Sequence, residues 1–362
     1  MGLSATIAHM ALIDPSLDCV SLTEALCNIE SVSLNEAEIC AGIEAVLRAQ
    51  SHLRVTRIGN SLVARTELGR PERVVIAGHI DTVPLNNNLP VTNDGEFLHG
   101  LGTCDMKSGV AVALKLATSV PSPNRDLTFV FYEAEEIDAK FNGLNHIVAQ
   151  RPDLIEADFA ILMEPSNGRV EAGCQGTLRI EVITRGERAH SARSWMGHNA
   201  IHDAGEVLRR LQQYVARQPV VDGLTYHEGL NAVLISGGVA TNVIPDECRV
   251  TVNYRYAPDR SEQEAQAFVR EFFDGFEIDI VDSAAGARPG LDRPAAQDFV
   301  KAVGGEVAPK FGWTDVALFT RLGVPAVNFG PGDPVYAHKA DEQVPIAQIH
   351  SVEASMRQWL GA

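Results

Sequence analysis

The sequence lacks the features that mark membrane, secreted and disulfide-rich proteins. It has no apolar run long enough to span a bilayer, and its amino-terminal residues show no basic region followed by an apolar core. Its six cysteines are widely spaced and form no C-x-x-C pair. We therefore expect buried thiols in a reducing compartment, with neither an export signal nor a transmembrane helix, which favours the cytoplasm.

Basic charge is also scarce. The chain carries 30 Lys and Arg against 47 Asp and Glu, a formal net charge of −17 at pH 7. Nucleic acids and anionic membranes require a basic footprint, so neither is an expected partner. The hydrophobic share of 45% is typical of a soluble globular protein, and 362 residues exceed one ordinary core. Two domains, or one domain with a large insertion, are expected.

Four apolar runs are typical of buried strands, and each leads into polar residues. The runs cover residues 74–77, 127–132, 158–163 and 324–329. They are followed by His79, by Glu135 and Glu136, by Glu164, and by a Gly- and Pro-rich turn before His338. Strands that alternate with helical patterns predict an α/β domain with an open, largely parallel sheet. Ligands of such sheets bind beyond the carboxyl ends of the strands, where these side chains converge.

Between these strands the pattern changes to that of a half-solvated sheet. Apolar and polar residues alternate with period two at residues 178–184 and 248–255. We predict further strands near 231–236 and 277–281 and helices at 199–218 and 261–273. The resulting order, β-α-β-β-α-β, indicates a ferredoxin-like insertion. The predicted organisation is an α/β catalytic domain, residues 1–177 and 282–362, with a mixed, largely parallel sheet covered by helices, and an inserted α+β domain at 178–281.

The polar residues at the strand ends have the composition of a hydrolytic metal site. They offer imidazole nitrogen and carboxylate oxygen without thiolate, the ligand preference of zinc, cobalt or manganese, and comprise His79, Asp105, Glu135, Glu136, Glu164 and His338. Six groups exceed the needs of one catalytic zinc but suit two ions bridged by a carboxylate. Of two adjacent glutamates, one can coordinate while the other acts as general base. Asp81, two residues from His79 on an extended chain, faces the same side and can fix its tautomer.

Five ordered segments resemble the signature of the di-zinc M20 family of peptidases and deacylases. They are GHIDTVP at 78–84, GTCDMKSG at 102–109, Glu135-Glu136, MEPS at 163–166, and the late His338. The resemblance implies two zinc ions, for which cobalt can substitute: one held by His79 and Glu164, the other by Glu136 and His338. It also implies that Asp105 bridges them, that Glu135 is the general base, that Asp81 stands behind His79, and that a cis peptide follows Asp105.

The inserted domain shares in this resemblance. Residues 188–200 are similar to the family motif whose histidine reaches the site of a partner subunit, so the resemblance implies a homodimer. His190 would then stabilise the tetrahedral oxyanion across that dimer, and the insertion would be a dimerisation (lid) domain. Asn242, Arg255 and Thr314 resemble substrate-contact positions. An arginine suits a substrate carboxylate because it binds in a bidentate fork.

Three more segments, at 171–177, 286–291 and 312–315, resemble the actinobacterial branch of the succinyl-diaminopimelate desuccinylases within the family. That branch implies hydrolysis of N-succinyl-LL-2,6-diaminopimelate to succinate and LL-2,6-diaminopimelate, in lysine and cell-wall synthesis. One position departs from the pattern. Leu318 stands where an arginine for the succinyl carboxylate is expected, and Arg321, one turn further on, is a candidate substitute.

Other interpretations stay open at this level. The same metal centre serves other amidohydrolases of the family that act on small N-acyl amino acids or peptides, such as an acetylornithine deacetylase, an aminoacylase or a dipeptidase. A non-catalytic dimeric binding protein is a further alternative, although it would have no need of Glu135. Residues 102–108 also resemble a phosphate-binding loop with Lys107, but Met106 replaces its second glycine and Asp105 would repel phosphate.

Overall fold

The computed structural model describes residues 13–362, which divide into two compact units. The first unit contains the described residues up to Ala172, together with Gly290–Ala308 and Leu318–Ala362. The second contains Gly173–Pro289 and Pro309–Ala317. The catalytic and dimerisation roles predicted for the two parts of the chain stay predictions. Among the described residues, no helix is both long enough and apolar enough to cross a membrane.

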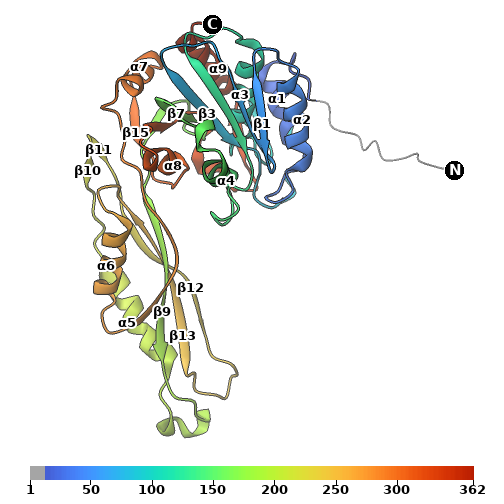
Figure 1. Cartoon of the computed structure of the whole chain (residues 1–362). Helices are drawn as coiled ribbons and strands as arrows, with labels where there is room; N and C mark the ends of the chain where they lie inside the picture. Colours follow the sequence, from blue (N-terminus) through green and yellow to red (C-terminus); the bar gives the residue numbers. More distant parts are fainter. Residues whose placement is uncertain (1–12) are drawn as a thin grey trace, which may run out of the picture. The chain divides into compact units, whose positions relative to one another are not determined.

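The first unit is built on an eight-stranded mixed sheet with the order β1-β2-β6-β3-β7-β16-β8-β15 (Figure 1). Its strands are β1 (Arg54–Ile58), β2 (Ser61–Arg65), β3 (Arg73–His79), β6 (Asp126–Tyr132), β7 (Phe159–Leu162), β8 (Val170–Ala172), β15 (Val307–Pro309) and β16 (Ala326–Asn328). The neighbours β6, β3, β7 and β16 run parallel, whereas β1, β2 and β8 pair antiparallel. The four parallel strands are those predicted from the apolar runs, so the α/β class and the mixed sheet are confirmed.

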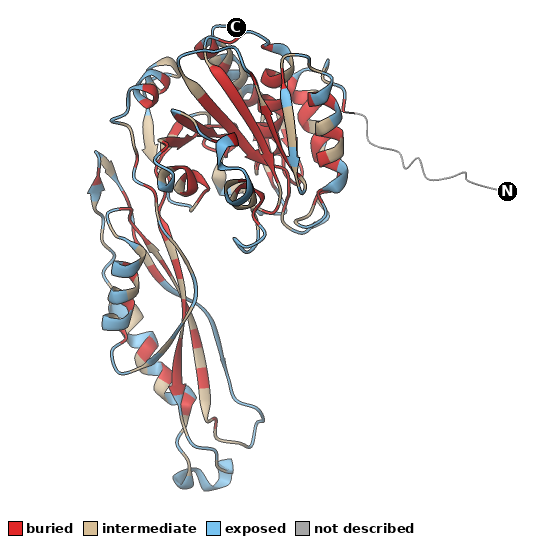
Figure 2. Ribbon diagram, viewed as in Figure 1, coloured by how far each residue is buried: buried red, intermediate tan, exposed pale blue. Residues whose placement is uncertain are grey.

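Burial explains why these four strands are recognisable in the sequence. Every residue of β6 and β7 is buried, as is every residue of β3 after Arg73, and Figure 2 shows the central strands as the buried layer. Parallel strands covered on both faces read as continuous apolar runs. Helix α3 (Lys107–Ser119) packs on β3, and α1 (Cys19–Cys27), α2 (Ala37–Arg48) and α9 (Ile346–Leu360) pack around α3.

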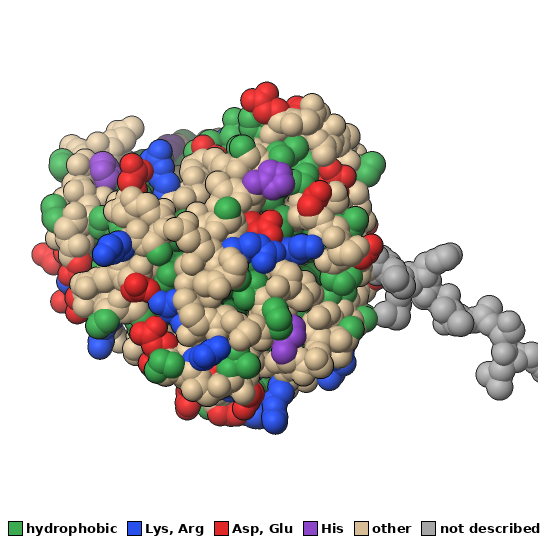
Figure 3. Space-filling model, turned by 90° about the horizontal axis from the view of Figure 1, so that it is seen from above, with side chains coloured by type: hydrophobic (Ala, Val, Ile, Leu, Met, Phe, Trp, Pro, Cys, Tyr) green, Lys and Arg blue, Asp and Glu red, His purple; other side chains and the backbone are tan. Residues whose placement is uncertain are grey.

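The remaining elements of this part of the chain are short. The helices are α4 (Gly143–Gln150), α7 (Pro294–Ala302) and α8 (Val316–Arg321), with single 3-10 turns η1 (Pro152–Leu154) and η3 (Pro334–Tyr336). A separate three-stranded sheet contains β4 (Thr92–Asn93), β5 (Phe97–His99) and β17 (Gln343–Pro345). All six cysteines are buried free thiols, as predicted. On the face shown in Figure 3, acidic and basic side chains are interspersed.

The second unit contains a four-stranded antiparallel sheet with the order β12-β13-β9-β14. Its elements are β9 (Gly176–Arg185), η2 (Ser191–Met196), α5 (Ala200–Gln213), β12 (Gly229–Gly237), β13 (Glu247–Tyr256), α6 (Glu262–Phe272) and β14 (Glu277–Ala284). Apart from the turn η2 and a short hairpin between α5 and β12, this is the predicted β-α-β-β-α-β order. Residues alternate along β13 between buried and half-buried, because α5 and α6 cover only one face of the sheet.

Helix α5 is shorter than the predicted 199–218 helix. It ends because Tyr214 adopts an extended backbone, with φ −64° and ψ 128°. The Tyr214 ring packs instead on Phe268 and Phe272 of α6, with ring centroids 6.2 and 5.8 Å away. The chain then forms a hairpin, β10 (Val220–Val221) and β11 (Leu224–Thr225), that the sequence did not predict. Tertiary packing here outweighs helix propensity.

Candidate metal centre

The parallel register brings the polar strand ends to one edge of the sheet. β3 is paired with β6 as far as His79 and with β7 as far as Ala77. Glu135 and Glu136 follow β6, and Glu164 follows β7, so they leave the sheet at the same edge as His79. This is the edge at which parallel α/β sheets bind their ligands. The parallel pairing of β3 with β6 and β7 therefore explains why the polar side chains after these strands converge, as predicted.

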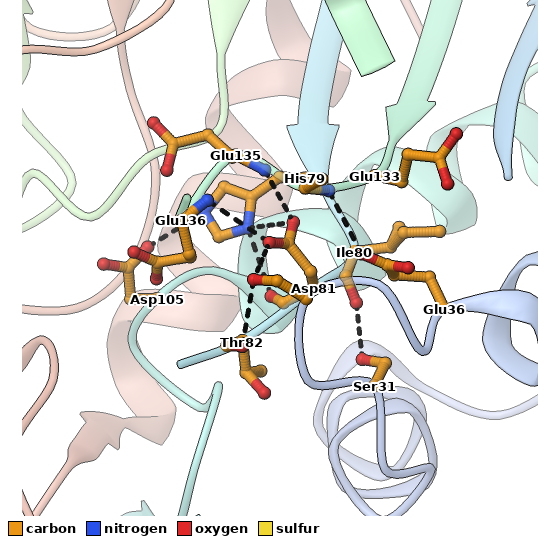
Figure 4. Close-up of polar contacts among 12 residues, drawn as sticks. Ser31, Glu36, His79, Ile80, Asp81, Thr82, Asp105, Glu133, Glu135 and Glu136 are labelled. Atoms are coloured by element: carbon orange, nitrogen blue, oxygen red, sulfur yellow. Dashed lines mark hydrogen bonds and ion pairs between the residues drawn. The ribbon is translucent and has the colours of Figure 1, made fainter. Parts of the chain in front are cut away.

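Four of the predicted ligands contact one another there. The Nε2 atom of His79 lies 3.1 Å from Oδ1 of Asp105, and Nε2 of His338 lies 3.4 Å from Oδ2 of the same carboxylate. His338 Nε2 also lies 2.9 Å from Oε2 of Glu136. Donor atoms of His79, Asp105 and Glu136 all lie within 4.8 Å of one another (Figure 4). Glu164, 5% exposed, stands outside this three-residue group although it leaves the same sheet edge.

Asp81 orders both the histidine and the glutamate pair. His79 Nδ1 lies 3.2 Å from the Asp81 carbonyl oxygen and 3.4 Å from its Oδ1, an arrangement that holds a proton on Nδ1 and leaves Nε2 free to coordinate. The two carboxylate oxygens of Asp81 also accept the backbone N–H groups of Glu135 and Glu136, at 3.1 and 3.2 Å. Burial would raise the pKa of Asp81, but the bonds from His79 and Ser33 outweigh it and lower that pKa.

Glu342 holds the loop that carries Asp105, and sequence reasoning missed it. Its Oε1 accepts the backbone N–H groups of Cys104 and Asp105, at 2.9 and 3.0 Å, and the residue is 1% exposed. Burial raises the pKa of Glu342 to about 7. The peptide between Asp105 and Met106 is cis, as the family resemblance implied. The only sequence signal for Glu342 was its place four residues after His338.

Lys107 argues against the phosphate-loop interpretation. The residue is 1% exposed, and its Nζ donates a hydrogen bond to the carbonyl oxygen of Ile29 at 2.8 Å. Burial lowers the pKa of this amine to about 8. A lysine whose ammonium group is directed into the core does not present its charge to a phosphate.

The second unit separates the other predicted residues into two groups. His190 forms an isolated bridge with Val243, and the N–H of Ser191 donates to the Asn242 carbonyl at 2.9 Å, so His190 and Asn242 are neighbours. They lie in loops at the end of the sheet where β9 finishes and β13 begins. Arg255 pairs with Thr177 near the opposite end of the same strands. At about 3.3 Å per residue, the stretch of β13 from Glu247 to Arg255 is roughly 26 Å long.

Arg255 and Thr314 differ in their surroundings. Thr314 is buried, and its carbonyl accepts a bond from the Cys174 thiol at 3.7 Å. Arg255 is half-buried on the face of the sheet without helices, and burial lowers its pKa. Within residues 13–362, no hydrogen bond or ion pair is made by its guanidinium group.

The sequence pattern of peptidase family M20/M25/M40 matches residues 75–361. The protein belongs to this family. A succinyl-diaminopimelate desuccinylase of Corynebacterium glutamicum is 46% identical over 355 residues, 95% of this chain and 96% of that protein. A Mycobacterium tuberculosis protein, provisionally named as the same desuccinylase, is 53% identical over 353 residues, 97% of this chain and 100% of that one. A tripeptidase structure from Staphylococcus aureus has a TM-score of 0.78 at 21% identity, covering 96% of this chain and 98% of the other, so the two chains share a fold.

The donor set of this M20 chain fits a divalent metal ion. Its contacting atoms are imidazole nitrogens and carboxylate oxygens, and the nearby Cys104 thiol donates instead to the carbonyl of Asp333 at 3.2 Å. The two carboxylates raise the pKa of His338 to about 10. Burial opposes protonation of His79, but Asp105 and Asp81 raise its pKa well above the ordinary value. The same carboxylates that attract a cation thus also attract protons.

We expect metal binding to release protons. The pKa of His338 is raised to about 10 and that of His79 is also raised, so a metal ion that binds these imidazoles competes with protons. Zinc affinity should consequently weaken as pH falls from 8 to 6, by about tenfold per unit for each proton displaced. Calorimetric titration in buffers of different ionisation enthalpy measures the number released. We expect more than one proton per chain, and about one fewer in His338→Ala; a heat of binding independent of the buffer would contradict this account.

Proposed function

We propose that the protein is a di-zinc amide hydrolase that converts N-succinyl-LL-2,6-diaminopimelate and water to succinate and LL-2,6-diaminopimelate, a step of lysine and diaminopimelate biosynthesis in the cytoplasm. The observation that carries the proposal is the cluster of the buried His79 and the half-buried Asp105 and Glu136 at the sheet edge, in a chain whose actinobacterial relatives have desuccinylase names. The substrate is a small N-acyl amino acid, and nucleic acid and membrane are not partners.

Five residues hold two zinc ions in this proposal, and Co²⁺ can replace them. His79 and Glu164 would hold one ion, Glu136 and His338 would hold the other, and Asp105 would be shared by both. The two Asp105 oxygens support the bridging role because one faces His79 and the other faces His338. Bound divalent ions supply Lewis acidity toward the amide carbonyl and lower the pKa of water.

The chain's own groups move the protons. Glu135 takes a proton from the attacking water as oxygen bonds to the acyl carbon, and it later gives that proton to the amine as the C–N bond breaks. Asp81 keeps His79 in the coordinating tautomer and fixes the backbone of Glu135 through its N–H. His190 of a partner subunit donates a hydrogen bond to the developing oxyanion, and Asn242, Arg255 and Thr314 bind the substrate.

We also propose that the second unit is a ferredoxin-like dimerisation (lid) domain, and two observations support a homodimer. His190 with Asn242 lies at one end of its sheet and Arg255 near the other, farther apart than one small substrate extends. A second subunit removes this conflict by supplying one of the two groups. In addition, the edge strand β12 exposes large apolar side chains: Val233 is 53% exposed, Leu234 70% and Ile235 53%.

Position 318 differs from the arginine expected to bind the succinyl carboxylate. Leu318 is 2% exposed, so its side chain belongs to the core and offers nothing to a carboxylate. Arg321 is exposed, and its Nη2 lies 3.4 Å from Oδ1 of Asn145. Arg255, which has no ion-pair partner within the described residues, is the better candidate for a substrate carboxylate. Because Leu318 offers no group to a succinyl carboxylate, the second candidate function is that of another amidohydrolase of the family. Examples are an acetylornithine deacetylase, an aminoacylase or a dipeptidase.

Rates on a panel of substrates test the function. We expect N-succinyl-LL-2,6-diaminopimelate to be hydrolysed at least about 100-fold faster, by kcat/KM, than N-acetylornithine, N-acyl amino acids or dipeptides, a difference of about 2.7 kcal/mol in transition-state binding. Chelation should abolish the activity and added zinc or cobalt should restore it. Equal rates across the panel would reject the desuccinylase assignment, and activity in verified metal-free protein would reject the metal mechanism.

Glu135→Gln separates the general base from the ligands. The substitution keeps the shape of the side chain but removes its ability to accept a proton, so kcat should fall by about 10²–10⁴-fold. Metal content, measured by elemental analysis, should remain two ions per chain. The matched variant Glu136→Gln should instead bind less metal. Loss of an ion from Glu135→Gln would show that the two roles are assigned to the wrong neighbours.

Leu234→Glu tests the homodimer. A charge on the exposed apolar edge of β12 should disfavour association, shift the protein from dimer to monomer in light scattering, and lower kcat by removing the partner's His190. Leu68→Glu, at a leucine of the first unit that is 39% exposed, is the control and should leave both quantities unchanged. A wild-type monomer with full activity would contradict the proposal.

A further inference from the structure

The turn that precedes α2 reaches the metal centre. In the structure, the N–H of Thr82 donates to the Ser31 carbonyl at 3.0 Å, and the N–H of Ser33 donates to the Thr82 carbonyl at 3.1 Å. The hydroxyl of Ser31 donates to the carbonyl of Ile80 at 2.6 Å. Residues 31–33 are thus paired with the segment that follows His79 (Figure 4).

Glu36 extends this contact to the glutamate pair. It occupies the N-cap position of α2, where a carboxylate ordinarily accepts bonds from the first turn, yet its side chain makes no capping bond. Its Oε1 instead accepts the N–H of Leu34 at 2.8 Å and the N–H of Ala134 at 3.2 Å. Both donors are non-glycine residues in the left-handed region, with φ of 74° and 57°. Such residues are uncommon and need support from their surroundings.

The hydrogen bond between Ala134 and Glu36 is one of three that consecutive backbone N–H groups donate to carboxylates. The consecutive N–H groups of Ala134, Glu135 and Glu136 are accepted by Oε1 of Glu36, Oδ1 of Asp81 and Oδ2 of Asp81. Ser33 in turn donates its hydroxyl to Oδ2 of Asp81 at 2.7 Å. All three of these backbone donors are therefore held by carboxylates. Glu36 supplies one of the carboxylates, and Ser33 contacts the other, that of Asp81.

We propose that Glu36 and Ser33 are positioning residues of the hydrolytic site. Glu36 stabilises the left-handed turn at Ala134 and thereby sets the direction of Glu135 and Glu136, while Ser33 holds the Asp81 carboxylate in place. The effect on catalysis rests on the hydrolytic function proposed above, whereas the effect on the turn does not. A general base displaced by a fraction of an ångström loses much of its efficiency, because catalysis depends on near-attack geometry.

Three variants test the proposal, with hydrogen exchange as the first measurement. Glu36→Ala removes the acceptor, so the amides of residues 134–136 should exchange about tenfold faster, with those within β6 unchanged. Glu36→Gln keeps an acceptor oxygen and should retain most of the protection. Glu38→Ala is the matched control, since Glu38 is exposed and lies two residues further along the same helix. Ser33→Ala should loosen the same amides to a smaller extent.

Kinetics and metal binding supply the second readout. Glu36→Ala should lower kcat about 10- to 100-fold with KM nearly unchanged and should weaken zinc affinity through Glu136, and Glu36→Gln should restore both. If Glu36→Ala leaves amide exchange and zinc affinity as in wild type, the positioning role is wrong. If amide exchange rises while no substrate of the panel is hydrolysed even by wild type, the turn is held as described and the proposed hydrolytic function is what fails. If Glu36→Ala does not fold, amide exchange in Glu36→Gln and Ser33→Ala still tests the positioning role. Equal, wild-type protection of residues 134–136 in both variants would then contradict the role of Ser33.

Discussion

The metal centre depends on the buried carboxylate of Asp81. This one group faces Nδ1 of His79, accepts the hydroxyl of Ser33, and receives the backbone N–H groups of Glu135 and Glu136. It therefore joins the end of β3, the turn after β6 and the turn before α2. A carboxylate with 0% exposure is costly to bury unless its oxygens are satisfied, and here each oxygen has more than one partner. The same bonds that stabilise the charge fix the positions of the ligands.

Electrostatics explains why this edge of the sheet suits cations. Burial raises the pKa of Glu136, Glu342 and Glu36, which shows that the local environment disfavours additional negative charge. Lys107 offsets part of that charge, since its buried amine interacts with Asp81 and Glu342. Two raised histidine pKa values show the remaining attraction for positive charge. A divalent ion satisfies this attraction without requiring the imidazoles to be protonated, so the cluster is organised for metal binding before any substrate arrives.

The sequence predicts the parts of this arrangement that depend on local pattern. Apolar runs identify β3, β6, β7 and β16 because parallel strands are buried on both faces. His79 and Asp81 are recognisable together because they lie two residues apart. Glu36 and Glu342 could not be found in that way, because each acts on backbone groups 98 and 237 residues distant, respectively. Acceptors of backbone N–H groups leave no side-chain pattern at the residue they hold, so only the tertiary structure reveals them.

The helix-free face of the sheet in the second unit carries several charged side chains. On its helix-free face, arginines are paired with acids: Arg249 lies within 2.7 Å of both Glu181 and Glu247, and Arg185 lies 2.9 Å from Glu277. These exposed ion pairs contribute little stability individually, but they neutralise the face. Arg255 is the exception among the described arginines of β13, because it is half-buried and has no acidic partner within bonding distance. A guanidinium group that is partly desolvated and unpaired gains most from an incoming carboxylate. This unpaired charge is the observation that supports the substrate-binding role proposed for Arg255.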